Sequence, residues 1–180
     1  MEIQHTFIND LLIIHPKVFA DGRGYFYESW NKQSFEKAGI HSEFVQDNQS
    51  LSQPGVLRGL HFQNPPYAQA KLVRVIAGGV LDVAVDIRKN SPTYGKHFSI
   101  ELSAENKIMF YIPEGFAHGF LTLQEDTIFA YKCAGFYNKT SEGSLLWNDP
   151  DLNIDWGIAS PLLSAKDMTG NSFKDFVSRF

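Results

Sequence analysis

The chain of 180 residues has a single cysteine, Cys133. One cysteine excludes a disulfide bond within the chain and agrees with a reducing compartment, so we expect a cytoplasmic protein. No apolar stretch approaches the roughly 20 residues that a helix needs to cross a bilayer. The first residues also lack the basic and apolar segments of a secretory signal. We therefore expect neither a membrane protein nor a secreted one.

Charge of one sign is not concentrated anywhere in the sequence. Sixteen Lys and Arg against 20 Asp and Glu give a formal net charge of −4, and the cations are scattered, which argues against a nucleic-acid partner. The composition is that of a globular protein, and the length suits one core, so we expect a single domain over residues 1–180. The aromatic share of 14% favours strands and offers flat surfaces for stacking a planar ligand.

Alternation of apolar and polar residues dominates the middle of the chain. The segments 71–77 and 80–88 flank Gly78-Gly79, and we expect them to pair as a hairpin about that turn. The second segment has two faces. Leu81, Val83, Val85 and Ile87 share one face, and Asp82, Asp86 and Arg88 share the other.

Further short strands are expected at 25–30, 43–50, 55–63, 97–102, 107–112, 115–123 and 127–136. Many short strands separated by Gly, Pro and Asn predict a sandwich or closed barrel, with a jelly roll as the leading choice. Helices are few. Residues 31–38 form one candidate, with Asn31 as N-cap and Gly39 as the stop, and residues 172–180 form another.

The familiar catalytic motifs are missing. A metal-binding jelly roll typically has a His-x-His pair, but here the pair reads His61-Phe-Gln63, and an amide replaces imidazole poorly on a transition metal. Cys133 in a strand indicates a small core residue rather than a nucleophile. No Gly-x-Ser-x-Gly elbow, phosphate-binding loop or dinucleotide fingerprint is present. Acid–base chemistry without a metal or other cofactor is what remains.

Five polar residues lie within apolar or glycine-rich strand segments, where burial without a partner is costly. They are Arg58, His61, Lys71, His118 and Tyr131. Each alone fits a hydrogen-bonded group of the core or rim. Together they fit catalysis: a histidine accepts a carbon-bound proton, a lysine stabilises an enolate oxygen, and a tyrosine returns a proton.

Nine motif blocks, in one order along the chain, surround these residues. They are Asp21-Gly-Arg-Gly-Tyr-Phe26, Phe44-Val-Gln-Asp-Asn48, Val56-Leu-Arg-Gly-Leu-His-Phe-Gln63, Gln69-Ala-Lys-Leu-Val-Arg74, Asp82-Val-Ala-Val-Asp-Ile-Arg88, Ser91-Pro-Thr-Tyr-Gly95, Ile112-Pro-Glu-Gly-Phe-Ala-His-Gly-Phe120, Trp147-Asn-Asp-Pro150 and Ser164-Ala-Lys-Asp167. In these blocks the sequence resembles the dTDP-4-dehydrorhamnose 3,5-epimerase family, from about Phe19 to Asp167.

The resemblance implies an all-β, cupin-like jelly roll (a double-stranded β-helix barrel) with a few short helices, usually a homodimer, that needs no metal. The implied substrate is dTDP-4-dehydro-6-deoxy-D-glucose, which is inverted at C3 and C5 to dTDP-4-dehydro-L-rhamnose in dTDP-L-rhamnose biosynthesis. Both carbons flank the C4 ketone. Removing either proton therefore gives an enolate, and reprotonation from the opposite face inverts the carbon.

The resemblance also implies roles for individual residues. His61 would be the base, Asp167 would orient its ring, Lys71 would contact the C4 oxygen, and Tyr131 would be the acid on the far face. The substrate-binding residues would be Arg23, Arg58 and Lys166 at the diphosphate or sugar, Glu28, Gln46, Asp47, Asn48 and His118 as polar contacts, Tyr137 and Phe26 at the thymine, and Glu142.

Two matters stay open in the sequence. Arg58 and His61 have opposite parity on an ideal strand, so either Gly59 marks a bulge or Arg58 serves a partner subunit's site. The function also has alternatives. An epimerase that inverts only C3 or only C5 would use the same base and acid, and a non-catalytic carbohydrate-binding jelly roll and a metal enzyme are more distant ones.

Overall fold

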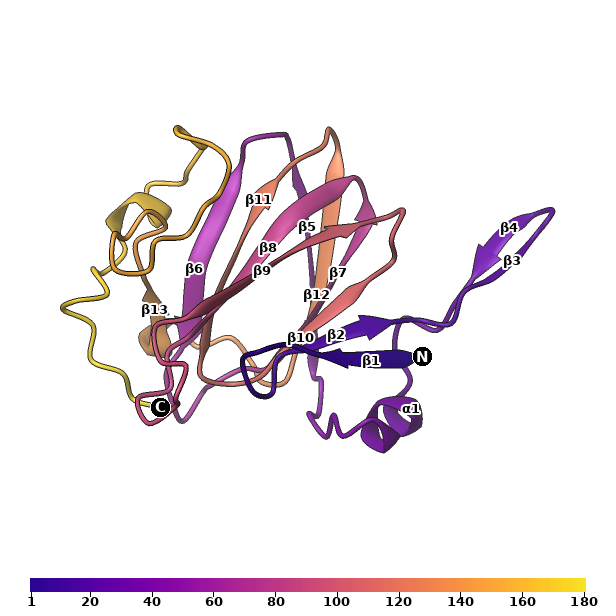
Figure 1. The fold of residues 1–180 in the computed structure, drawn as a ribbon, viewed down its shortest axis with the longest axis horizontal. Coiled ribbons are helices and arrows are strands. Elements are labelled where there is room, and N and C mark those ends of the chain that lie inside the picture. The colour runs from indigo at the N-terminus through magenta and orange to yellow at the C-terminus, as the bar shows by residue number, and fades with distance from the viewer.

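Two antiparallel sheets face each other in the computed structural model, which describes residues 1–180 (Figure 1). The larger sheet has the order β1 (Glu2–His5), β2 (Leu12–His15), β10 (Met109–Ile112), β7 (Lys71–Ala77), β12 (Thr127–Cys133) and β5 (Gln46–Ser52). The smaller has the order β13 (Glu142–Ser144), β6 (Leu57–Gln63), β11 (Phe116–Thr122), β8 (Gly79–Asp86) and β9 (His97–Ser103). This is the jelly roll that the strand pattern predicts.

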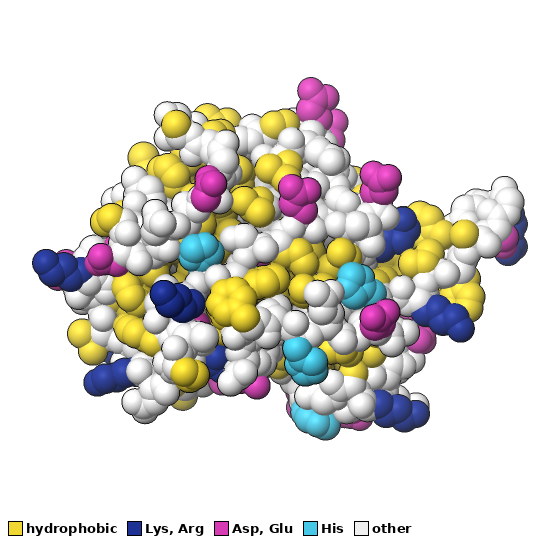
Figure 2. Space-filling model, in the orientation of Figure 1, with side chains coloured by type: hydrophobic (Ala, Val, Ile, Leu, Met, Phe, Trp, Pro, Cys, Tyr) yellow, Lys and Arg dark blue, Asp and Glu magenta, His cyan; other side chains and the backbone are white.

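A separate two-stranded hairpin projects from the body of the molecule (Figure 1). It consists of β3 (Phe19–Asp21) and β4 (Gly24–Phe26), which pair over only three residues. The expected strand 25–30 therefore ends early, because the chain turns after Phe26 toward the helix. Charged side chains lie at the tip of the projection and hydrophobic ones nearer the body (Figure 2).

Only one α-helix forms, and it confirms the first helix prediction. Helix α1 (Lys32–Lys37) begins after Asn31, whose side chain accepts a hydrogen bond from the backbone N–H of Ser34. The N-cap thus satisfies one of the free N–H groups of the first turn. Gly39 then adopts a φ of +84°, a conformation that favours glycine and ends the helix.

The second helix prediction is wrong, because residues 172–180 form no helix. The apolar residues that gave the segment its helical pattern pack instead onto the outer face of the smaller sheet; they are Phe173, Phe176 and Phe180. Two hydrogen bonds hold the segment there: the Ser178 hydroxyl donates to Ile87 O, and the backbone N–H of Lys89 donates to Phe180 O. Two 3-10 helices, Lys139–Ser141 and Asp167–Thr169, complete the helical elements.

The predicted hairpin about Gly78-Gly79 is also wrong. Strands β7 and β8 belong to different sheets, so the chain crosses from one sheet to the other at these glycines. Gly78 has a φ of +73°, and a Cβ there would lie 2.2 Å from Thr127 Oγ1. That hydroxyl accepts a hydrogen bond from the backbone N–H of Gly79. The two glycines therefore provide a tight crossover rather than a strand-pairing turn.

The apolar core has three parts. Val73, Val80, Phe110 and Phe129 belong to the cluster between the two sheets. A second cluster fills the outer face of the smaller sheet, where Val83, Val85 and Ile87 pack under the C-terminal segment, as their shared face predicts. A third lies between the larger sheet and α1. The strand residues of β8 that point inward include the fully buried Asp82, which leads directly to the candidate site.

No helix of the chain is both long and apolar enough to cross a membrane. On the face shown in Figure 2, the Lys and Arg side chains are spread among acidic ones rather than gathered into a basic patch.

Candidate active site

A cavity of about 290 Å³ opens between the two sheets, and we name it the His118 cavity. Its lining includes Arg58, His61 and His118 from the smaller sheet, Ser50, Lys71, Phe129 and Tyr131 from the larger sheet, and Ser164 and Asp167 from the C-terminal segment. A second cavity, the Tyr137 cavity, shares His61, Lys71 and Tyr131 with the first. The structure therefore brings the predicted base and the predicted acid together on facing walls.

Asp167 binds the ring of His61 directly. Its Oδ1 lies 2.6 Å from His61 Nε2 and accepts a further hydrogen bond from the backbone N–H of Gly59. Its Oδ2 accepts from Ser164 Oγ at 2.6 Å. A carboxylate at Nε2 fixes the tautomer, so Nδ1 is left as the ring nitrogen that can take a proton from a substrate.

The surroundings of Asp167 keep its carboxyl ionised. Burial by itself raises the pKa, but hydrogen bonds from His61, Ser164 and Gly59 outweigh burial and lower the pKa to about 2. An ionised carboxylate in this position orients the His61 ring and can stabilise an imidazolium that forms during a reaction.

The lowered pKa predicts how acid affects stability. A carboxyl whose folded pKa lies below its unfolded value of about 3.9 stabilises the fold above that pH, and the contribution is lost as pH falls through the folded pKa. Wild type should therefore be more stable than Asp167→Asn at neutral pH, and the difference should shrink between about pH 4 and about pH 2. Urea unfolding of both proteins across this range measures it. A difference that stays constant down to about pH 2 would contradict the assignment.

A second histidine–carboxylate pair lies beside the first. His118 Nε2 is 3.0 and 2.9 Å from the two oxygens of Asp82, and both residues are buried. Burial lowers the pKa of His118, although the Asp82 charge opposes the shift. His118 is thus oriented as a neutral hydrogen-bonding group on the cavity wall. In the β11–β6 register, it lies directly opposite His61.

The opposite wall holds Lys71 and Tyr131. The Lys71 ammonium lies 5.8 Å from the centre of the Tyr131 ring. Burial lowers the pKa of Lys71, while Cys133, Asp82 and Glu142 oppose the shift. Burial also raises the pKa of Tyr131, so its phenol keeps its proton at neutral pH. This wall can therefore supply both a cation and a proton donor.

A bulge at Gly59 explains how Arg58 and His61, which an ideal strand would point to opposite faces, reach the same cavity. His118 pairs with His61 and Phe120 with Arg58, so two steps along β11 match three along β6. Gly59 has a φ of +129°, and a Cβ there would lie 2.4 Å from Gly119 Cα. The extra residue turns Arg58 and His61 toward the same cavity. Arg58 Nε also donates to Ser52 Oγ.

The Tyr137 cavity collects other predicted binding residues, including Gln46, Asn48, Tyr137 and Glu142. Glu142 joins two of the predicted contacts, because it pairs with Lys166 Nζ and accepts a hydrogen bond from Tyr137 OH at 3.3 Å. The Tyr137 side chain is exposed. Its ring is therefore available for stacking at the mouth of the site.

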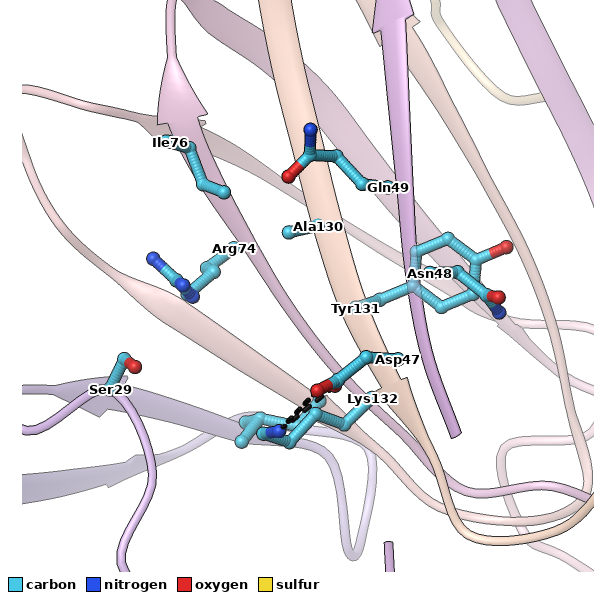
Figure 3. Close-up of a pocket in the computed structure, with 10 residues that line it drawn as sticks. Ser29, Asp47, Asn48, Gln49, Arg74, Ile76, Ala130, Tyr131 and Lys132 are labelled. Carbon is cyan, nitrogen blue, oxygen red and sulfur yellow. Dashed lines mark hydrogen bonds and ion pairs between the residues drawn. The ribbon is translucent and has the colours of Figure 1, made fainter. Parts of the chain in front are cut away.

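Five predicted binding residues line neither cavity of this chain, although one of them, Lys166, pairs with Glu142 of the Tyr137 cavity. Arg23 and Phe26 lie on the projecting hairpin, and Glu28 follows it and binds Asn31. Asp47 pairs with Lys132 on the outer face of the larger sheet. Figure 3 shows Asp47 and Gln49 on the same side of this sheet as Arg74 and Ile76, whereas Asn48 and Tyr131 point to the other side.

Gln63, which broke the metal-binding pattern, has a structural role. Its amide nitrogen donates to Tyr67 O and Phe136 O, and its oxygen accepts from the backbone N–H of Asn138. No group of three or more His, Cys, Asp and Glu residues is arranged to hold a metal ion.

Sequence reasoning missed Asp82 and Ser164 as members of the site. Both occur within the recognised motif blocks, but their partners are distant: Asp82 binds a histidine 36 positions away. Ser164 is three positions from Asp167 and was the easier of the two to find, since Ser-x-x-Asp is a spacing at which a hydroxyl can reach a carboxylate.

Comparison with known proteins identifies the family of the chain. The family model for dTDP-4-dehydrorhamnose 3,5-epimerase matches residues 5–175. The Shigella flexneri dTDP-4-dehydrorhamnose 3,5-epimerase is 56% identical over 176 residues, which are 97% of each chain. The Elizabethkingia anophelis enzyme of that name superposes with a TM-score of 0.93 at 55% identity, covering 97% of each chain. A Legionella pneumophila 3,5-epimerase, solved with dTDP-4-keto-L-rhamnose, gives 0.94 at 49% identity, covering 98% of this chain and 94% of that one.

The fold and these relatives together define an isomerase built on a jelly roll. Within that class, the chain belongs to the dTDP-4-dehydrorhamnose 3,5-epimerase family.

Proposed function

We propose that the protein inverts C3 and C5 of dTDP-4-dehydro-6-deoxy-D-glucose, giving dTDP-4-dehydro-L-rhamnose for dTDP-L-rhamnose biosynthesis. The observation that carries the proposal is the pair of facing walls: His61, backed by Asp167, on one, and the protonated Tyr131 with Lys71 on the other. A ketone-bearing sugar between them has a base on one face and an acid on the other, which is what inversion requires.

In this mechanism, His61 Nδ1 removes the proton from the carbon beside the ketone, and the electron pair moves onto the C4 oxygen. Asp167 stabilises the resulting imidazolium, and the Lys71 ammonium stabilises the enolate. Tyr131 then gives its proton to the carbon from the opposite face. Exchange with solvent returns His61 and Tyr131 to their starting states before the second carbon reacts. Each inversion therefore brings a solvent-derived proton onto carbon.

Lys71→Met should lower kcat by about 10²–10³-fold, because a methionine of similar length cannot stabilise the enolate oxygen. The melting temperature should not fall, since the variant removes a partly buried charge that makes no hydrogen bond with a carboxylate. Steady-state kinetics with thermal unfolding checks both expectations. A kcat within about threefold of wild type would contradict this role for Lys71.

The product identifies the reaction. With the 4-keto-6-deoxy nucleotide sugar and EDTA, we expect NMR to show inversion at both carbons. Inversion at one carbon would identify a mono-epimerase, which uses the same base and acid. Binding without any reaction would identify a carbohydrate-binding protein and would contradict the proposal.

We also propose that the protein works as a homodimer in which Arg23, Phe26 and Glu28 complete the partner's site. The projecting hairpin supports this, since Phe26 is 65% exposed and Phe19 is 54% exposed. Beside its base, the outer face of the larger sheet is hollowed by about 270 Å³ next to Arg74 and Ile76. Exposed aromatic residues next to an open sheet face suit an isologous contact with a second copy.

Mixing two inactive variants tests this arrangement. In mixed dimers of Arg23→Ala and His61→Ala, one site carries both defects and the other carries none if Arg23 acts in the partner's site. After subunit exchange about half the dimers are mixed, and each mixed dimer has one intact site of its two. At low substrate concentration we therefore expect recovery of about one quarter of wild-type activity. No recovery, with dimers confirmed by light scattering, would place Arg23 in its own chain's site.

Two further expectations from the sequence remain proposals. We propose that residues 1–180 act as one domain, since both sheets contribute to the cluster between them. A cytoplasmic location, expected from the single cysteine, stays a prediction.

A further inference from the structure

Strand β5 presents a row of polar side chains to the space between the sheets. Every second residue points inward: Gln46, Asn48, Ser50 and Ser52. Three of the four have partners within the chain: Gln46 bonds to Asn48 and to the backbone N–H of Tyr137, Asn48 to the Cys133 thiol, and Ser52 to Arg58. The exception is Ser50.

The Ser50 hydroxyl is buried and has no hydrogen-bond partner in the chain. Burying a hydroxyl without a partner is unfavourable, so such a group in a native protein calls for an explanation. Ser50 lines the His118 cavity and pairs in register with Phe129. Since the chain itself offers no partner, a group bound in this cavity is the candidate partner for the hydroxyl.

The position of Ser50 indicates which part of a nucleotide sugar it meets. It lies on the same wall as Tyr131 and Lys71, in the cavity that also contains His61 and His118. Tyr137, the proposed thymine-stacking residue, lines the other cavity and not this one. Ser50 is thus at the sugar end of the site.

The chemistry of the hydroxyl narrows the choice further. A serine hydroxyl can both donate and accept hydrogen bonds, as a sugar hydroxyl does. A phosphate would be better matched by a cation. Phe120 and Phe129 border the same cavity, and apolar ring faces suit the C–H faces of a pyranose.

We propose that Ser50 Oγ binds a hydroxyl group of the hexose ring and helps to set the sugar specificity of the site. This inference rests on the proposed function for the identity of the sugar. It assigns to Ser50 a binding role, with no part in the proton transfers.

Ser50→Ala tests the inference, and Thr122→Val is its matched control. Thr122 Oγ1 is the other buried hydroxyl without a partner, but Thr122 lines neither cavity. We expect Ser50→Ala to lower kcat/KM for the 4-keto-6-deoxy sugar about tenfold, with the affinity for dTDP within about twofold of wild type. Ser50→Thr, which keeps the hydroxyl, should retain more activity than Ser50→Ala. Thr122→Val should match wild type in both measurements.

The melting temperature separates binding from a structural role. Ser50→Ala removes no hydrogen bond within the chain, so its melting temperature should be no lower than that of wild type. An unchanged kcat/KM, an equal loss of dTDP affinity or a lowered melting temperature would each overturn the inference. A result that contradicts the proposed function is distinguishable from these, because the wild-type protein itself would then invert neither carbon.

Discussion

Replacing His61 by alanine is expected to abolish proton exchange at both C3 and C5. The variant loses the ring that is paired through Nε2 with Asp167 at 2.6 Å and leaves Nδ1 for the substrate proton. General acid–base groups contribute about 10²–10⁴ in rate, and one base serving both carbons puts the full loss on both. Exchange in D₂O, followed by NMR at each carbon, measures the effect separately at the two positions.

His15→Ala is the control for this variant. His15 lies on β2 in the larger sheet, its ring is hydrogen-bonded to Gln4 at 3.3 Å, and it lines neither cavity. It should exchange like wild type. Loss of exchange at one carbon alone in His61→Ala would contradict the single-base mechanism and would direct attention to His118 as a second base.

Replacing Tyr131 by phenylalanine is expected to separate exchange from inversion. Proton removal by His61 survives, but the phenol that returns a proton from the opposite wall is gone. Inversion should fall by about 10²–10⁴-fold while exchange with retained configuration falls much less. Comparing the rate of deuterium uptake with the rate of product formation measures the split.

Tyr111→Phe is the matched control for Tyr131→Phe. Tyr111 is also partly buried, burial raises its pKa, and its hydroxyl binds Ser42 at 2.8 Å on a part of the larger sheet that lines neither cavity. It should invert normally. If Tyr131→Phe also inverts normally, another group on that wall is the acid.

The sequence predicts the strands well where a single strand decides its own pattern. On β8, Val83 and Val85 do share a face, and Ile87, just after the strand, packs in the same cluster, because alternation is a property of one strand. Pairing is not. Gly78-Gly79 correctly marks the boundary between two strands, but whether these strands bond to each other depends on the crossover between sheets, which no local signal encodes.

The helix prediction for residues 172–180 is wrong for a related reason. The spacing of Phe173, Phe176 and Phe180 suits a helix face, yet the outer face of the smaller sheet accepts these rings from an irregular chain. Tertiary packing outweighed the local pattern there, as it often does in short segments.

The features of the candidate site also differ in whether the local sequence reveals them. Gly59 between Arg58 and His61 was visible in the sequence as a candidate bulge, and the structure has the bulge there. The partner of His118 was not visible, since Asp82 comes from another strand. Ser50 was hidden for a stronger reason: its importance lies in a missing hydrogen bond, which only the surroundings reveal.

Deuterium incorporation by the wild-type protein tests the central claim most directly. The protein is incubated in D₂O with EDTA and the 4-keto-6-deoxy nucleotide sugar, and C3 and C5 are followed by NMR. We predict deuterium at both carbons of the inverted product, because the proton that Tyr131 returns comes from solvent. Inverted product that keeps its original hydrogen at either carbon, or folded protein that exchanges neither, would contradict the opposed-wall mechanism.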